Sequence, residues 1–261
     1  MKVISLQSGS NGNSFYVEAD DVRLIFDAGI SGKQAQQRLA EHGRDIASCQ
    51  GLFISHDHSD HTRCMGVYHR KFGLPLYITK KTLRATTRHR EIGPLEDVRF
   101  FTPGDFRSFP TARGSKVTVH SVATPHDSAE GVAFIIEHED KRVGILTDLG
   151  HVFPALRELL LSLDAVVIES NYDPQMLEHG PYPEPLKRRI RGRGGHISND
   201  ECADLIGRAS MFRRLKWACL CHLSEHNNEP AIAAEACRRV VGDNVQIHVA
   251  SRHDASDIME I

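Results

Sequence analysis

Residues 51–61 read Gly-Leu-Phe-Ile-Ser-His-Asp-His-Ser-Asp-His, and the expected fold follows from this stretch. The first part, 51–55, is short, apolar and rich in β-favouring residues, so it predicts a buried strand. The second part, 56–61, holds three imidazoles and two carboxylates. Because loops at strand ends often carry chemistry, we expect a functional loop to begin at His56.

The spacing His56-x-His58-x-Asp60-His61 suits metal binding. Neutral imidazole is a good ligand for Zn²⁺, Fe²⁺ or Mn²⁺, and carboxylate oxygens suit the harder of these ions. In an extended segment His56 and His58 point the same way, after which Asp60 and His61 can turn to a neighbouring point. The alternative is a solvated polar turn, which is less expected directly after a buried strand. We therefore predict a metal site.

The bulk composition is that of an ordinary globular protein. With 261 residues, 40% of them apolar, and no repeat or linker-like segment, the chain is expected to form one domain over residues 1–261. The net charge of −2 gives no general attraction to nucleic acid, although a local basic patch remains compatible with it. Sixteen histidines are more than a core needs and fit metal or proton chemistry.

Cysteine usage and the N-terminus indicate a cytoplasmic protein. None of the six cysteines forms a C-x-x-C pair, so we expect free thiols in a reducing compartment. The N-terminus turns polar at once and lacks the apolar core of a signal peptide. No stretch approaches 18 apolar residues, so no membrane span or membrane partner is expected.

The apolar patterns predict alternating strands and helices. Strands are expected at 2–7, 15–18, 22–26, 51–55, 76–79, 98–101, 116–121, 131–137, 142–147, 164–169, 215–220 and 246–250. Helices are expected at 31–42, 62–72, 80–90, 151–162, from 198 or 199 toward 211, and at 231–241. The small residues at 8–14 predict a hairpin turn, with a loop beside the active site as the alternative.

Four more polar residues follow predicted strands. Asp27 and Asp148 each end an apolar strand close to a glycine, a pattern that is also typical of simple turns. His126 lies just past a strand, and His222 ends the late strand at 215–220. A lone loop histidine usually has no special role, so these residues gain meaning only together with the 56–61 cluster.

The motif at 56–61 resembles the signature of the metallo-β-lactamase superfamily. The resemblance implies an α/β fold, the αββα four-layer sandwich, with two divalent metal ions (Zn or Mn; Fe possible). It implies that Asp148 bridges the ions and that Asp27 supports the metal loop through hydrogen bonds. The remaining implied ligands are His56, His58 and His126 for one ion, and Asp60, His61 and His222 for the other.

Further segments resemble the YycJ/WalJ-like branch of this superfamily. They are Ser-Gly-Ser-x-Gly-Asn-Ser at 8–14, Glu-Ser-Asn at 169–171, Gly-Gly-His-Ile-Ser-Asn at 194–199 and His-Leu-Ser-x-x-Asn-Asn at 222–228. That branch implies a bacterial cytoplasmic metallohydrolase, thought to be a DNA exonuclease. The expected activity is therefore phosphodiester hydrolysis by a two-metal-activated hydroxide, as a 5′ DNA exonuclease, with DNA more expected than RNA.

Two other kinds of function stay open from the sequence. One is a small-molecule (cyclic) phosphodiesterase or thioester hydrolase of the same superfamily, because fold alone does not choose the substrate. The other is a binding protein with structural or sensing metals. Structural sites are usually closed and thiolate-rich, unlike this His/Asp set, so this alternative is the weakest.

The same resemblance and the local charge suggest residues that contact substrate. Asp60 and His196 are the expected catalytic residues, and His196, Ser198, Asn171 and Arg193 are the expected substrate contacts. The basic runs at 80–90 and 187–193 are either solvated helix faces or contacts with a long polyanion.

Overall fold

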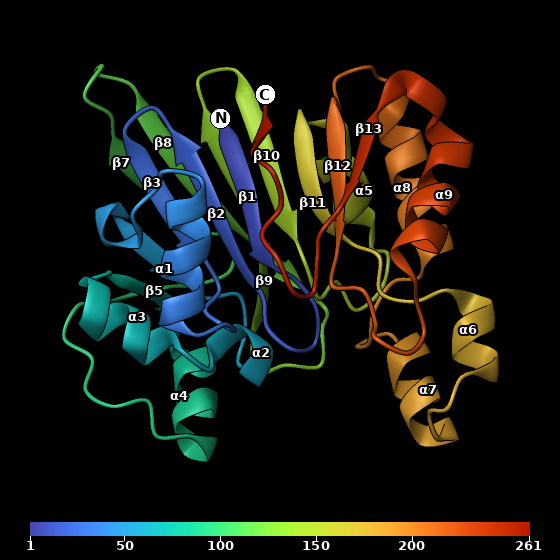
Figure 1. The fold of residues 1–261 in the computed structure, drawn as a ribbon, viewed down its shortest axis with the longest axis horizontal. Coiled ribbons are helices and arrows are strands. Elements are labelled where there is room, and N and C mark those ends of the chain that lie inside the picture. Colours follow the sequence, from blue (N-terminus) through green and yellow to red (C-terminus); the bar gives the residue numbers. More distant parts are fainter.

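A computed structural model describes residues 1–261, which form two facing seven-stranded sheets with helices on both outer faces (Figure 1). The first sheet has the order β14-β1-β2-β3-β4-β5-β6, with bounds β1 Lys2–Gln7, β2 Ser14–Ala19, β3 Val22–Phe26, β4 Gly51–Phe53, β5 Leu76–Thr79, β6 Val98–Phe101 and β14 Met259–Glu260. The second has the order β13-β12-β11-β10-β9-β8-β7, with bounds β7 Phe106–Pro110, β8 Lys116–Thr124, β9 Gly131–His138, β10 Lys141–Leu146, β11 Ala165–Glu169, β12 Trp217–Cys221 and β13 Gln246–Val249.

Each sheet combines an antiparallel and a parallel half. Strands β1 to β3 and β7 to β10 pair antiparallel through short hairpins, whereas β3 to β6 and β10 to β13 pair parallel through helical crossovers. The carboxyl ends of parallel strands meet at one edge of a sheet. Both parallel halves therefore deliver their strand ends to the lower edge of the molecule in Figure 1.

Helices cover the two outer faces. On the first sheet lie α1 (Gly32–Glu41) and α3 (Met65–Phe72), and on the second lie α5 (Pro154–Leu161), α8 (Asn199–Ser210) and α9 (Pro230–Val241). Four helices sit at the lower edge in Figure 1: α2 (Ser59–Thr62), α4 (Lys80–His89), α6 (Pro174–His179) and α7 (Glu184–Arg191). Single 3₁₀ turns occupy Ile46–Ser48 and Gly242–Asn244.

Three apolar clusters hold these layers together. One cluster of 25 buried residues fills the space between the sheets, a second of 25 lies under α5, α8 and α9, and a third of 17 lies under α1 and α3. Strands that bury both faces need near-continuous apolar sequence, as β4 and β11 show. The predicted αββα sandwich is confirmed.

Several element boundaries differ from the sequence expectation. The helix expected at 62–72 is split at Cys64 into α2 and α3, and β8 runs to Thr124 instead of 121. The pattern also missed β7, whose residues alternate between exposed and partly buried, and the two-residue edge strand β14. Helix α6 was missed because its start is marked only by Asp173 and Pro174.

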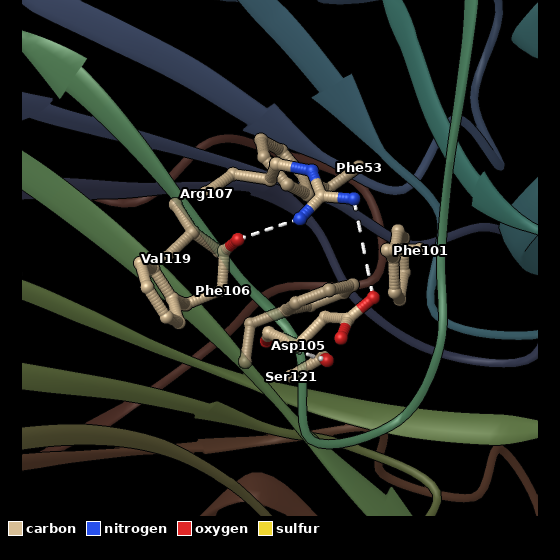
Figure 2. Close-up of a pocket in the computed structure, with 8 residues that line it drawn as sticks. Phe53, Phe101, Asp105, Phe106, Arg107, Val119 and Ser121 are labelled. Atoms are coloured by element: carbon tan, nitrogen blue, oxygen red, sulfur yellow. Dashed lines mark hydrogen bonds and ion pairs between the residues drawn. The ribbon is translucent and has the colours of Figure 1, made fainter.

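The space between the sheets is nearly filled. A cavity of about 10 Å³ lies near β6 and β7. Figure 2 shows the aromatic rings and the Asp105–Arg107 ion pair that line it. A space of this size holds at most one water molecule, so it is a packing gap and not a ligand site. None of the helices is both long and apolar enough to cross a membrane.

Candidate metal centre

Three histidines predicted for one metal ion meet at the lower edge of the sandwich. His56 follows β4, His58 is the residue before α2, and His126 follows β8. One ring nitrogen from each lies within 4.8 Å of the others, and His126 Nε2 is 3.3 Å from His58 Nδ1. Strands β4 and β8, from different sheets, thus bring His56 and His126 together although they lie 70 positions apart in the sequence.

The second predicted triad lies beside the first. Asp60, His61 and His222 also present ligand atoms within 4.8 Å of one another. Asp148, at the end of β10, lies between the triads: its Oδ2 is 3.2 Å from His61 Nε2, and its Oδ1 is 3.5 Å from His126 Nε2. A carboxylate in this position is suited to sharing two cations, which is the role predicted for Asp148.

The donor set fits divalent cations. His56 Nε2 is buried and has no hydrogen-bond partner, although an unsatisfied buried polar atom costs roughly 1–3 kcal/mol. Burial lowers the pKa of His56 well below its usual range, which keeps the ring in the neutral, metal-binding form. Burial alone would raise the pKa of Asp148, but the His222 and His61 rings hold it well below its usual range. His56 and Asp148 therefore offer neutral imidazole and ionised carboxylate, the ligands that Zn²⁺ and Mn²⁺ accept. At His222, in contrast, burial alone would lower the pKa, but the nearby carboxylates of Asp148 and Asp60 raise the pKa to about 10, so a cation would have to displace a proton from this ring.

Asp27 lies behind the metal loop, where the sequence analysis expected it. Its Oδ1 accepts a hydrogen bond from the Ser55 backbone N–H at 2.8 Å, and its Oδ2 lies 2.7 Å from His61 Nδ1. A buried carboxylate on Nδ1 fixes the tautomer of a histidine and leaves Nε2 free as a ligand. Asp27 therefore orients His61 toward Asp148.

The N-terminal turn forms part of the same centre. Residues 8–13 connect two paired strands, as expected for a hairpin, and the loop also packs on the metal residues. Asn13 Nδ2 lies 3.2 Å from Asp60 Oδ2 and 3.0 Å from His61 Nε2, while Ser8 Oγ accepts a hydrogen bond from the His222 backbone N–H. Both interpretations of this stretch were therefore partly right, but Asn13 itself was not singled out.

Glu169 is the main site residue that the sequence analysis did not assign. It ends β11, is fully buried, and its Oε1 lies 2.5 Å from His196 Nδ1 and 3.4 Å from His222 Nδ1. Burial alone would raise the pKa of Glu169, but the nearby His196 lowers it to about 2. The sequence did contain a signal for Glu169. It is a carboxylate at the end of an apolar strand, as Asp27 is at the end of β3.

His196 connects this carboxylate to the cluster. Its ring centroid is 5.1 Å from the ring of His126 and 5.2 Å from that of His222, and its Nε2 makes no hydrogen bond within the protein. Its side chain is 17% exposed. A half-buried imidazole held at Nδ1 by a buried carboxylate is well placed to exchange a proton with a substrate.

Two of the four predicted substrate contacts make hydrogen bonds within the protein. Ser198 caps α8: its hydroxyl accepts the backbone N–H of Glu201 and donates to the Glu201 carboxylate, so it is already satisfied. Asn171 donates from Nδ2 to the His222 carbonyl at 2.7 Å and therefore positions that histidine. Arg193 is exposed beside His151, whose Nδ1 donates to the Arg193 carbonyl, and it stays a candidate contact together with His196.

The two basic runs fall on helices at opposite sides of the centre (Figure 1). On α4, Arg84 and Arg88 are exposed and lack an ion-pair partner. On α7, Arg189 pairs with Asp127 at 2.6 Å, and Lys187 is buried with its Nζ on the Glu178 carbonyl. Of the two interpretations left open for the run at 187–193, neither fits Lys187, which is buried, whereas Arg188 is exposed and unpaired.

Comparisons with known proteins agree with this geometry. A family model described as a β-lactamase superfamily domain matches residues 22–217. The chain is 32% identical to exodeoxyribonuclease YycJ of Bacillus anthracis, across 93% of this chain and 92% of the relative. It is 34% identical to exodeoxyribonuclease WalJ of Streptococcus pneumoniae serotype 2 (strain D39), across 87% of this chain and 83% of the relative.

Solved structures share the fold at low identity. The metallo-β-lactamase fold protein YhfI from Bacillus subtilis superimposes with a TM-score of 0.71 at 14% identity, covering 98% of both chains. Zn²⁺-bound PqqB from Methylobacterium extorquens gives a TM-score of 0.68 at 16% identity, covering 100% of both chains. The chain therefore belongs to the metallo-β-lactamase superfamily, as a YycJ-like, metal-dependent hydrolase.

Proposed function

We propose that this hydrolase is a DNA exonuclease that cleaves phosphodiester bonds from a 5′ end. The relatives that match most of the chain carry the name exodeoxyribonuclease, which supports DNA as the substrate. The observation that carries the proposal is the Glu169–His196 pair beside the His/Asp cluster, because it places a proton-exchanging group next to residues suited to metal ions.

The two triads with Asp148 between them support two divalent ions, Zn²⁺ or Mn²⁺ with Fe²⁺ also acceptable to this donor set. Ions in such a pair polarise a water and the phosphate oxygens, which lowers the barrier to hydrolysis. The chain's own residues prepare this centre: Asp27 orients His61, Asn171 and Ser8 hold the His222 backbone, and Asp60 and Asp148 supply negative charge.

His196 has the position of a general acid. Glu169 accepts the Nδ1–H of His196 and fixes the ring, so Nε2 is the atom available to pass a proton to a leaving oxygen. An alkoxide leaving group, such as the sugar oxygen of DNA, needs this proton. A p-nitrophenolate leaves without one, so a small activated diester should depend much less on the pair.

The open setting of the centre also supports a long substrate. His58, Asp60 and His196 are partly exposed, and α4 and α7 each carry exposed arginines. These two helices lie at the lower left and lower right of the molecule in Figure 1. Arginine and lysine on the rim attract the phosphates of a strand without reading its sequence. The overall charge of −2 does not contradict this, because screening by salt makes the charges close to the strand more important than the net charge.

The test compares end-labelled duplex DNA with bis-p-nitrophenyl phosphate, each with Mn²⁺ or Zn²⁺. We expect stepwise nucleotide release that is lost in His58→Ala and kept in the matched control His120→Ala, a histidine on β8 paired with Glu137. Glu169→Gln should lower kcat on DNA by roughly 10–100-fold, the usual effect of losing such a partner, and affect the small diester less.

Other outcomes would redirect the assignment. Turnover of the small diester with DNA untouched would identify a small-molecule phosphodiesterase, the alternative named above. Equal losses on both substrates in Glu169→Gln would remove the general-acid role of His196.

A further inference from the structure

A second cleft lies beside the metal centre and is lined by three arginines. Its volume is about 350 Å³, and its walls include Arg38 on α1, Arg63 just after α2 and Arg252 in the C-terminal segment. No carboxylate is among its lining residues. Clefts of a few hundred Å³ are large enough for a nucleotide-sized group.

Hydrogen bonds to neutral groups hold two of the guanidinium groups in place. Arg38 Nη1 donates to the Leu6 carbonyl at 2.9 Å and to Gln7 Oε1, and Arg38 Nη2 donates to the His253 carbonyl. Arg63 Nη2 donates to the Asn11 carbonyl at 2.8 Å. Because these hydrogen-bond partners carry no charge and Arg63 makes no ion pair, Arg63 keeps its full positive charge toward the cleft. The nearby Asp254 and Glu41 partly offset the charge of Arg38.

Two further features strengthen the positive character. Arg252 also lines the cleft, although Glu225 at 3.0 Å offsets its charge. Ser31 caps the ten-residue helix α1 at the cleft wall, so the positive end of the helix dipole faces the same space. An arginine fork with a helix N-terminus is the usual chemistry of phosphate recognition.

The cleft shares a wall with the metal loop. Gly29 lines the cleft, and its backbone packs so closely on the Asp60 carbonyl that an added Cβ would overlap that oxygen. Asn13 bridges the same two segments, since its N–H donates to the Asp60 carbonyl and its carbonyl accepts from Gly29. A phosphate bound in the cleft would therefore lie on the opposite side of this loop from the metal ligands.

The positive surface ends beyond Arg38. The adjoining cleft is lined by Glu41, Asp254 and Asp257 in addition to Arg38. A polyanion that continued along this path would meet carboxylates. The arginine cleft thus has room for a phosphate at the end of a strand but not for a strand that passes through.

We propose that the cleft of Arg38, Arg63 and Arg252 binds the terminal phosphate of a DNA strand. This deepens the proposed exonuclease function and rests on it, because it assigns the recognition of a strand end to a site separate from the metal centre.

The test measures binding of 12-nucleotide DNA with phosphorothioate linkages, which resist hydrolysis, to the Mn²⁺-loaded protein by fluorescence anisotropy. The oligonucleotides carry a 5′-phosphate, a 3′-phosphate or neither. We expect one terminal phosphate to tighten binding about tenfold in the wild type, the effect of one charge-assisted hydrogen bond. Arg63→Gln should remove this gain, Arg63→Lys should keep part of it, and the distant control Arg113→Gln should keep it all.

Each outcome decides the proposal. An equal gain in wild type and Arg63→Gln, or no gain at all, overturns it. Calorimetry with inorganic phosphate distinguishes free phosphate from the phosphate of a strand end. Suppose that inorganic phosphate binds, that Arg63→Gln abolishes this binding, and that a terminal phosphate does not change DNA affinity. The cleft would then be a site for free phosphate, and the strand-end role would be overturned.

The nuclease assay on the same preparations keeps the two proposals distinguishable. DNA hydrolysis with no Arg63-dependent gain means that the cleft proposal fails and the proposed function stands. An Arg63-dependent gain without hydrolysis means that the cleft binds strand ends and the exonuclease assignment fails.

Discussion

The two ends of the sandwich use the same unusual backbone conformation in different ways. At the end away from the metal centre, Asp20 and Glu139 have φ of 51° and 54° in two-residue hairpins between β2 and β3 and between β9 and β10. At the metal end, Asp27, Asp148 and His222 have φ of 62°, 54° and 55°. L residues rarely adopt this region, which costs roughly 1–2 kcal/mol.

The surroundings of these residues differ more than their dihedral angles. Glu139 is exposed, and its conformation is what a tight hairpin requires, so the cause is local. Asp27 and His222 are buried, and backbone hydrogen bonds from Asp27 to Phe53 and from His222 to the Ser8 hydroxyl hold them. Strain that tertiary contacts impose is a feature of functional sites, whereas strain within a hairpin is a feature of turns.

The largest expected effect comes from changing one carboxylate at each end. Asp148→Asn removes the charge between the two triads, so we expect turnover to fall by more than the roughly 100-fold that is typical of losing a supporting group. Asp20→Asn makes the same chemical change at a hairpin, where asparagine also accepts a positive φ, and should leave turnover unchanged. Normal activity of Asp148→Asn, measured on DNA with a thermal unfolding control, would refute the shared-carboxylate centre.

A second comparison uses the free energy of unfolding to distinguish strain within a hairpin, at Glu139, from strain imposed by tertiary contacts, at Asp27. Glu139→Gly should raise the free energy of unfolding by up to about 1 kcal/mol, because glycine adopts positive φ without the steric cost. Asp27→Gly has the same local benefit but loses the carboxylate that binds Ser55 and His61, so it should lower stability by roughly 2–3 kcal/mol.

Denaturant unfolding in excess chelator measures both variants without a contribution from metal binding. If Asp27→Gly were as stable as Glu139→Gly, the hydrogen bonds of Asp27 would contribute nothing to holding the metal loop, and its positive φ would be an ordinary turn.

The metal cluster could be predicted because the same local pattern, a histidine or aspartate just after a strand, occurs several times in the sequence. Each triad residue follows a strand, and strands that run in parallel must place such residues at one edge. The αββα layers followed from the resemblance carried by 56–61, and the alternation of strands and helices agreed with it, whereas the order of strands in each sheet was not predicted. No property of a single residue would have placed His126 beside His58.

The missed parts depend on tertiary partners. Glu169 was left without a role because a strand-ending glutamate is common, and only the fold brings His196, 27 residues later, onto its Oε1. Ser198 was expected to contact substrate from its type, but its hydroxyl is already bonded to Glu201. The basic run at 187–193 allowed two interpretations, and the sequence did not show that Lys187 would be buried on the Glu178 carbonyl. The arginine cleft joins residues from 38 to 252, a distance in sequence that no motif spans.

The smallest expected loss of stability concerns the partly buried ion pair of Glu18 and Arg44 at the hairpin end. Glu18 on β2 accepts hydrogen bonds from Tyr16 at 2.7 Å and from Arg44 at 3.1 Å. Burial alone would raise the pKa of Glu18, but these partners hold it below its usual value of 4.5. A lowered pKa in the folded state stabilises the protein above the unfolded-state pKa, and this stabilisation is lost as the pH falls through the folded-state pKa.

Glu18→Gln should therefore lower the free energy of unfolding by about 1–2 kcal/mol at neutral pH. The difference from wild type should shrink as the pH falls below 4.5, because wild-type Glu18 then becomes protonated as well. Urea unfolding at several pH values measures this, and DNA hydrolysis at neutral pH should stay unchanged because Glu18 is far along β2 from the metal loop. If the difference in the free energy of unfolding did not depend on pH, packing and not charge would explain the contribution of Glu18. If Glu18→Gln lost activity on DNA, the two ends of the sandwich would be coupled.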